Sequence, residues 1–242
     1  MKKVILSKVT RRYLLDFLFR LAVFLFIAAL YCFTPQTLDF TAPGKLSVPL
    51  IFLWLAVLSS MLVQLNPKSG LTTGCLKQYP SSYDPAEQYD PKLLTQAVKK
   101  QDLGALKVAV IWLAINLLFG HLYHRGLMRL QTLVLLCAFY YLCDLICVLF
   151  FCPFQFFLMH NRCCVNCRIF AWGSWMMAAP LLCVAHWYAR SLVAASVVVF
   201  AVWEVRYRRY PERFWFGSNR NLQCAHCTEQ LCHYKWPRTR NV

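Results

Sequence analysis

The chain alternates between long apolar runs and short polar segments. Six of these runs have the length that a helix needs to cross a bilayer, about 20 predominantly apolar residues. Because a backbone inside lipid must satisfy its own hydrogen bonds, each run is expected to be helical. The pattern predicts an all-α fold, a polytopic integral membrane bundle of six transmembrane helices. The runs cover residues 13–33, 46–65, 105–123, 130–151, 169–187 and 191–205.

The last two runs also allow a second arrangement. Only 38 residues separate the start of the fifth run at Ile169 from Arg206, so they just suffice for two crossings. A shallow hairpin that enters the membrane and turns back is the alternative. The first run resembles a signal anchor more than a cleaved signal, because it is long and lacks a small-x-small cleavage site near its end.

The runs divide the chain into four parts. Residues 1–65 hold the N-terminal anchor with transmembrane helices one and two, and residues 66–104 form a cytosolic loop. Residues 105–206 hold helices three to six, with a cysteine-rich inner loop at 160–168. Residues 207–242 form a basic, cysteine-rich cytosolic tail. We therefore expect one membrane bundle with two sizeable aqueous segments.

A helix start is encoded within the cytosolic loop. Asp90 can cap a helix whose first position is Pro91, a residue that fits there because no amide hydrogen is needed. Leu94 and Val98 share one face of this helix, and Lys99 is available to the other. The pattern favours an amphipathic helix at the membrane interface, and a solvated connector helix explains it equally well.

Composition excludes most soluble classes. Hydrophobic residues make up 59% of the chain and charged residues 15%, against roughly 45–50% and 25% in globular proteins. Disulfide scaffolds, coiled coils and disordered tails are inconsistent with this apolar content. The net charge of +16 would suggest nucleic-acid binding on a soluble chain. Here the polar surface is too small to carry that function, so nucleic acid is not an expected partner.

The distribution of basic residues predicts the orientation. With a cytoplasmic N-terminus, 21 of the 26 Lys and Arg residues fall in inner segments and four in outer loops. The positive-inside rule then places both termini in the cytoplasm, and the cytoplasmic (plasma) membrane is the expected location. The basic inner face predicts contact with anionic lipid headgroups. A protein partner at the cytosolic face is a further possibility.

The cysteines suggest a metal site. Eight of the thirteen lie at or beyond the inner face, in a compartment that keeps thiols reduced. Two Cys-x-x-Cys pairs, Cys164 with Cys167 and Cys224 with Cys227, supply four sulfurs. Two predicted crossings separate the pairs, so both emerge on the same face. Four thiolates suit a tetrahedral zinc ion, and we predict a cytosolic four-cysteine zinc knuckle below helices five and six.

Other ligands and other uses of these cysteines remain open. Iron–sulfur is less favoured than zinc, because zinc needs no assembly machinery and suits shells of cysteine with some histidine. Without a metal, the cysteines would be small buried residues, palmitoylation sites or thiols that exchange with a substrate disulfide. Alternate ligands, which are numerous enough for a second ion, are Cys163, Cys232, His160, His226 and His233.

Ionisable residues within the predicted spans are candidate functional groups, since charge is costly in a bilayer. Asp16 and Arg20 are four residues apart and can pair along the first helix, and Glu204 is a further candidate partner of Arg20. Asp144 lies within the fourth span on a face that includes Tyr140 and Tyr141. It is either a functional residue, in proton relay or substrate contact, or a buried carboxylate that accepts hydrogen bonds from tyrosines.

Three histidines lie near the outer ends of predicted helices. His121 and His124 end the third span, and His186 lies at the end of the fifth. Histidines at matching depth on two helices could hold a haem or a metal ion. Interfacial histidines without a cofactor are the more common arrangement, so haem is a minor hypothesis.

Three functions fit this picture. The preferred one is a binding or scaffold module at the inner membrane face, whose zinc-like site fixes a basic surface. The second is a membrane oxidoreductase that uses thiols, a cluster or haem with a quinone. The third is a small transporter that uses Asp144. No catalytic residue is identified, because the chain lacks nucleotide-binding, phosphate-loop, zinc-protease and serine-hydrolase motifs.

Overall fold

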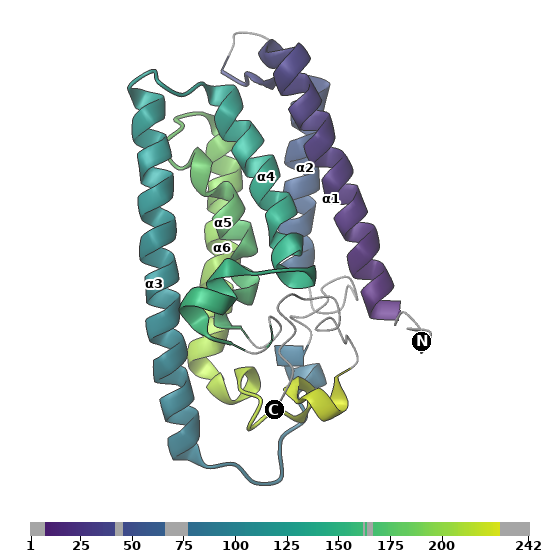
Figure 1. The fold of residues 1–242 in the computed structure, drawn as a ribbon, viewed down its shortest axis with the longest axis vertical. Coiled ribbons are helices and arrows are strands. Elements are labelled where there is room, and N and C mark those ends of the chain that lie inside the picture. The colour runs from purple at the N-terminus through teal and green to yellow at the C-terminus, as the bar shows by residue number, and fades with distance from the viewer. Residues whose placement is uncertain (1–7, 42–45, 66–76, 162, 164–166, 228–242) are drawn as a thin grey trace.

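The structure is a computed structural model that describes residues 8–41, 46–65, 77–161, 163 and 167–227. Helices build the described part of the chain, and it contains one isolated β-bridge, between Pro85 and Asn219. Five long helices run side by side (Figure 1). They are α1 (Lys8–Phe33), α2 (Val48–Leu65), α3 (Pro91–His124), α4 (Leu130–Leu149) and α6 (Trp187–Arg209).

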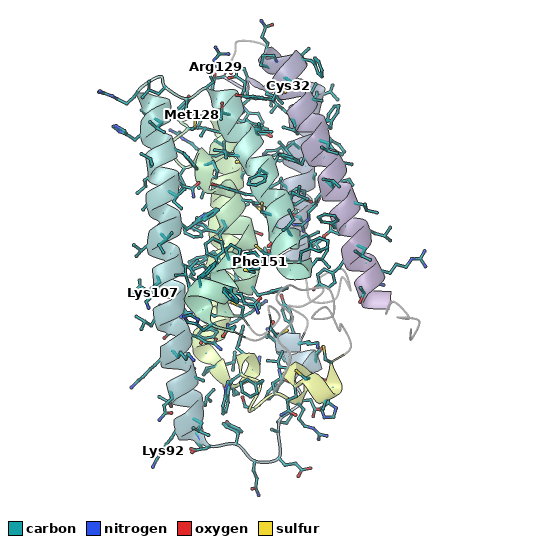
Figure 2. The ribbon with its side chains drawn as sticks, viewed as in Figure 1. Cys32, Lys92, Lys107, Met128, Arg129 and Phe151 are labelled. Atoms are coloured by element: carbon teal, nitrogen blue, oxygen red, sulfur yellow. The ribbon has the colours of Figure 1, made fainter. Side chains whose placement is uncertain are left out.

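These five helices are each long and apolar enough to cross a membrane, with mean hydropathies of 1.5 to 2.3 over their most apolar windows. Their outward faces are covered by large apolar side chains, such as Leu18 and Leu106, which are 58% and 60% exposed. Exposure on this scale would be a liability in water, whereas in lipid it is the expected surface. Arg129 and Lys92 mark opposite ends of the bundle (Figure 2). The architecture is compatible with an integral membrane protein.

Helix α3 begins where the sequence predicted and continues further. The Asp90 side chain accepts a hydrogen bond from the Lys92 amide at 2.8 Å, which confirms the N-cap. The 34-residue helix then continues to His124 without a break. The predicted interfacial helix and the third span are therefore one element, because no proline interrupts it after its first position. Gly104 within it leaves room for Met159. The helix is about 50 Å long, more than a bilayer core requires.

The fifth predicted span is not one long helix, which corrects the prediction of six full-length helices. It consists of the 3-10 helix η6 (Arg168–Trp172), α5 (Gly173–Ala178) and the 3-10 helix η7 (Ala179–Leu181). Pro180 within η7 cannot donate a backbone hydrogen bond, and the helix does not continue to α6. The segment still reaches both ends of the bundle. Arg168 pairs with Glu204 near the end of α6, and Cys183 packs against Gly120 near the end of α3.

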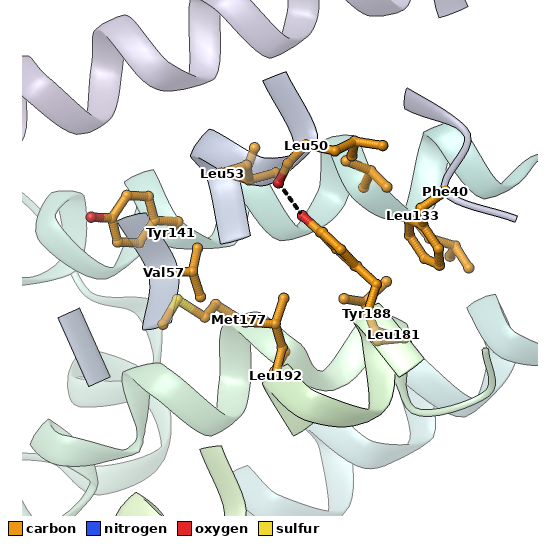
Figure 3. Packing of buried hydrophobic residues seen from close by; sticks show 14 of the residues in the cluster. Phe40, Leu50, Leu53, Val57, Leu133, Tyr141, Met177, Leu181, Tyr188 and Leu192 are labelled. Atoms are coloured by element: carbon orange, nitrogen blue, oxygen red, sulfur yellow. Dashed lines mark hydrogen bonds between the residues drawn. The ribbon is translucent and has the colours of Figure 1, made fainter. Parts of the chain in front are cut away.

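The main core lies between α2, α4, α6 and the broken segment (Figure 3). The ring of Tyr188 is 1% exposed, and its hydroxyl donates a hydrogen bond to the Leu50 carbonyl at 3.0 Å. Phe40 stacks on Tyr188 with ring centroids 4.6 Å apart. This contact ties the connection that follows α1 to the start of α6. Helix α1 packs mainly on α4, and near its N-terminal end Tyr13 is buried in a cluster with Leu145, Val148 and Leu149 of that helix.

The loop before α3 and the tail after α6 pack together at one end of the bundle. We call residues 77–90 and 211–227 the end cap. Asn219 is fully buried, and its amide donates to the carbonyls of Lys77 at 3.0 Å and Arg213 at 2.9 Å. The Ala86 amide donates to the Ser218 carbonyl at 3.0 Å. Short 3-10 helices form the tail part of the cap: η8 (Pro211–Phe214), η9 (Arg220–Leu222) and η10 (Cys224–His226).

Candidate binding cavity

A charged triad joins α1 to α4 inside the bundle. Arg20 donates to Asp16 at 3.1 Å, one helical turn away, which confirms the predicted pair. It also donates to Asp144 Oδ2 at 2.9 Å and to the Tyr141 carbonyl at 3.0 Å. The guanidinium carbon lies 4.3 Å from the centre of the Tyr141 ring. Asp144 is therefore held by an arginine, and not by the tyrosine hydroxyls that the sequence suggested.

Burial explains why Arg20 has so many partners. Its side chain is 11% exposed, and an unpaired charge at such a place would be strongly destabilising. The side chains of Asp144 and Asp16 are 33% and 43% exposed. The two carboxylates are thus open on one side, although both belong to helices of membrane-spanning length. The exposed side faces a cavity.

The cavity has a volume of about 550 Å³ and lies between α1, α2, α4 and the broken segment. Arg12, which is exposed, lines it one helical turn before Asp16. Phe19 of α1 and Phe52 of α2 meet edge to face at a centroid distance of 6.5 Å, and Phe19 forms part of the wall. The apolar wall includes Leu15, Phe19, Val63, Leu145, Val148 and Met177.

Polar side chains fix the wall opposite the triad. Ser174 Oγ donates to Gln64 Oε1 at 2.6 Å, and Gln64 Nε2 donates to the Ala171 carbonyl at 3.3 Å. These bonds tie α2 to the broken segment. Ser59 and Ser60 also line the cavity, and their hydroxyls donate to carbonyls of their own helix. The cavity therefore has polar groups on two sides within a largely apolar wall.

Gly173 lets the broken segment approach Asp144 closely. A Cβ placed on Gly173 would lie 2.5 Å from Asp144 Oδ1, which is shorter than any ordinary contact. No side chain or amide of the described residues donates a conventional hydrogen bond to Oδ1, whereas Oδ2 is held by Arg20. Gly173 thus leaves room for a carboxylate whose Oδ2 is held by Arg20 and whose Oδ1 lies beside the glycine without a described donor.

A smaller cavity of about 90 Å³ lies on the other side of this contact. Asp144, Val148, Phe170 and Gly173 line both cavities, so they form the partition between the two. Ile169 and eight aromatic or sulfur-containing side chains cover the remaining wall. The eight are Trp112, Tyr140, Phe154, Cys143, Cys147, Cys152, Cys167 and Met176.

A second buried arginine anchors the broken segment near the end cap. Arg168 is 8% exposed in its side chain and pairs with Asp102 of α3 and Glu204 of α6. Trp172 Nε1 donates to Glu204 at 2.9 Å, and the Trp203 indole donates to the Arg168 carbonyl at 3.0 Å. Glu204 therefore partners Arg168 and not Arg20, which corrects the sequence-based pairing. The cluster is an anchor that sets the depth of Gly173.

The predicted zinc ligands lie only partly within the described residues. Cys164, Cys232 and His233 lie outside them. Cys167 is buried, whereas Cys224 is exposed and Cys227 is half-buried. Cys163, His160 and His226 are described, and no three His, Cys, Asp or Glu side chains in the described ranges are grouped to hold a metal ion. The four-cysteine zinc site, like an iron–sulfur cluster, stays a prediction.

The three outer histidines have separate surroundings. His121 and His124 are exposed on the last turn of α3. His186 caps α6, where its Nδ1 accepts a hydrogen bond from the Tyr188 amide at 3.3 Å, and its ring lies 5.1 Å from that of Phe40. Capping gives His186 a structural role without a cofactor. Haem stays an untested hypothesis.

Sequence reasoning identified Asp16, Arg20 and Asp144 individually, and it missed Gly173 as the residue that positions Asp144. A glycine inside an apolar run was the available signal, because glycine allows a close approach of the backbone to a neighbour. The chain matches no protein-family model, and comparisons with curated proteins and with solved structures find no match. The chemistry of the cavity is therefore the basis for assigning a function.

Proposed function

We propose that this protein is a small membrane transporter that binds a cation in the cavity between α1, α2 and α4. Asp144 is the substrate-contact residue. The observation that carries the proposal is its environment: Arg20 holds Oδ2, no described donor holds Oδ1, and the side chain borders a cavity of about 550 Å³. This is the third of the functions that the sequence allowed.

The charge balance of the triad favours a cation. One guanidinium faces two carboxylates, so the ionised triad carries one net negative charge. Arg12 is exposed and also lines the cavity, so the four charged side chains of the whole wall balance, while the triad around Asp144 keeps its one net negative charge. Inside the bundle screening is weak, so a positive ligand on Asp144 would interact strongly. Ionisable residues at membrane depth commonly mark such ion and substrate paths.

The broken segment supports transport over a purely structural role. Irregular backbone at membrane depth is tolerated where it is buried in protein or lines a water-filled cavity. Transporters place substrate sites at such helix interruptions. Here η6 passes into α5 at Gly173, the residue in contact with Asp144. The helix interruption therefore coincides with the carboxylate oxygen that has no described donor.

The other two functions depend on groups that the described residues do not assemble. The scaffold function needs the four-cysteine site, which includes Cys164, and the oxidoreductase function needs a redox centre. Neither has a supporting contact in the cavity. They stay hypotheses from the sequence, and zinc analysis of the purified protein tests the first.

Uptake into reconstituted liposomes tests the proposal. Purified protein is reconstituted, and uptake of labelled Na⁺, methylammonium and phenethylammonium is followed under an inside-negative potential. We expect at least one cation to enter faster than in empty liposomes, with at least about a tenfold loss of rate in Asp144→Asn. The matched control is Asp39→Asn, because Asp39 precedes α2 and does not line the cavity.

Two results would contradict the proposal of a cation transporter in which Asp144 contacts the substrate. One is uptake of all three cations at the rate of empty liposomes. The other is equal uptake by the wild type and Asp144→Asn. Helical content and elution volume are compared for all proteins, so that an unfolded variant is recognised. Asp144→Glu is a second variant, because it keeps the charge while moving it by one methylene.

A further inference from the structure

The cavity is too large and too apolar for a bare inorganic ion. Pockets of roughly 300–1,000 Å³ hold molecules of drug size, and this one measures about 550 Å³. A small ion on Asp144 would leave most of that space as water against Leu15, Val63 and Met177. Water forms few favourable contacts with such walls, whereas the transfer of an apolar group from water to these walls is favourable in free energy.

The charges of the triad lie on one side of the cavity, whereas the polar side chains on the other side, Ser59, Ser60, Gln64 and Ser174, are uncharged. The triad supplies charge at one side, from α1 and α4. The apolar side chains come from all the surrounding elements, including Phe19 on α1, Val63 on α2 and Met177 on α5. A ligand that fills this space needs one cationic end and an apolar remainder. An amine with an aromatic or alkyl body has that form.

We infer that the ligand class is a lipophilic amine, a protonated amine that carries an apolar body. This inference rests on the proposed function. The ammonium group donates a hydrogen bond to Asp144 Oδ1 and neutralises the net charge of the triad. The body lies against Phe19, Val63 and Met177. Arg20 remains bonded to Oδ2 and so orients the carboxylate, while Gly173, which has no side chain, leaves space for Oδ1.

Binding of three probes to the detergent-purified full chain tests the class. Phenethylammonium has charge and body, methylammonium has the charge alone, and 2-phenylethanol has the body alone. Equilibrium dialysis against protein-free micelles corrects for partition into detergent. We expect phenethylammonium to bind at least about tenfold more tightly than either of the others. Asp144→Asn should remove that advantage.

A cavity-filling variant tests the location without touching the charges. Val63→Phe adds volume inside the cavity and should weaken phenethylammonium binding at least about fivefold. Leu62→Phe is the matched control, because Leu62 is the neighbouring residue on α2, is 57% exposed and does not line the cavity. It should leave the affinity unchanged. Equal loss in both variants would overturn the location.

The remaining outcomes separate the ligand class from the transport function. If methylammonium binds as tightly as phenethylammonium and still needs Asp144, the class is wrong and cation transport stands. If 2-phenylethanol binds as tightly as phenethylammonium, the carboxylate does not select the ligand and the class is wrong. If no probe shows binding that depends on Asp144, the class is wrong, and the uptake rates of Na⁺ and methylammonium decide the transport function.

Discussion

Replacement of Gly173 by alanine would perturb the central contact of the cavity with a single methyl group. The added Cβ would lie 2.5 Å from Oδ1 and 2.9 Å from Cγ of Asp144. Ordinary contacts between such atoms are about 3.5–4.0 Å, so the carboxylate must move by roughly 1 Å. Asp144 is short and its Oδ2 bond to Arg20 is 2.9 Å long, so this movement lengthens or breaks that bond.

The expected effect on stability follows from this overlap. Insertion of a methyl group into a closely packed site costs about 1–3 kcal/mol. For a chain of 242 residues, each kcal/mol corresponds to roughly 2–4 °C of melting temperature. We therefore expect Gly173→Ala to melt roughly 5 °C below the wild type. Thermal unfolding in detergent, followed by the circular dichroism of the helices, measures the shift.

A double-mutant cycle shows whether the carboxylate causes the effect. In an Asp144→Ala background the clash partner is absent, so Gly173→Ala should then have a much smaller effect. If the two changes add to within about 0.5 kcal/mol, the residues do not interact and our interpretation of the contact is refuted. The affinity of the same variants for phenethylammonium shows whether the contact between Gly173 and Asp144 also affects ligand binding in the cavity.

Two further predictions concern the anchor and the cysteines. Arg168→Gln removes the positive partner of Glu204 at a buried position, so it should destabilise the protein by about 3 kcal/mol. Arg208 is exposed, and the control Arg208→Gln should change the stability by less than about 0.5 kcal/mol in the same melting assay. Elemental analysis of purified protein should find about one zinc per chain, lost on changing Cys164 and Cys227 to serine, and a folded protein free of metal would exclude the four-cysteine site.

The apolar pattern predicted most of the fold because the membrane imposes it locally. Each long helix corresponds to one run of apolar residues, and the capping signal of Asp90 gave the start of α3. The fifth run was misjudged for a physical reason. Hydropathy records that a segment avoids water and not how its backbone is bonded, so it gives no sign of the interruptions at Gly173 and Pro180.

The site was only partly predictable from the sequence. The Asp16 pair with Arg20 depends on helical spacing alone and was correct. The bond from Arg20 to Asp144 joins residues 124 positions apart, and it depends on which helices are neighbours. The choice of Glu204 as a partner failed for the same reason, since α6 lies beside Arg168 and not beside Arg20. Opposite charges in two predicted spans were a usable signal.

The bond between Asn219 and Lys77 also constrains the threading of the chain. Two residues in direct contact lie on one side of a bilayer, so the stretch between them must traverse it an even number of times. The helices α3, α4 and α6 are three candidate crossings, which is an odd number. If each of the three crosses a membrane, parity assigns the fourth passage to residues 168–186, although none of their short helices has the length of a span.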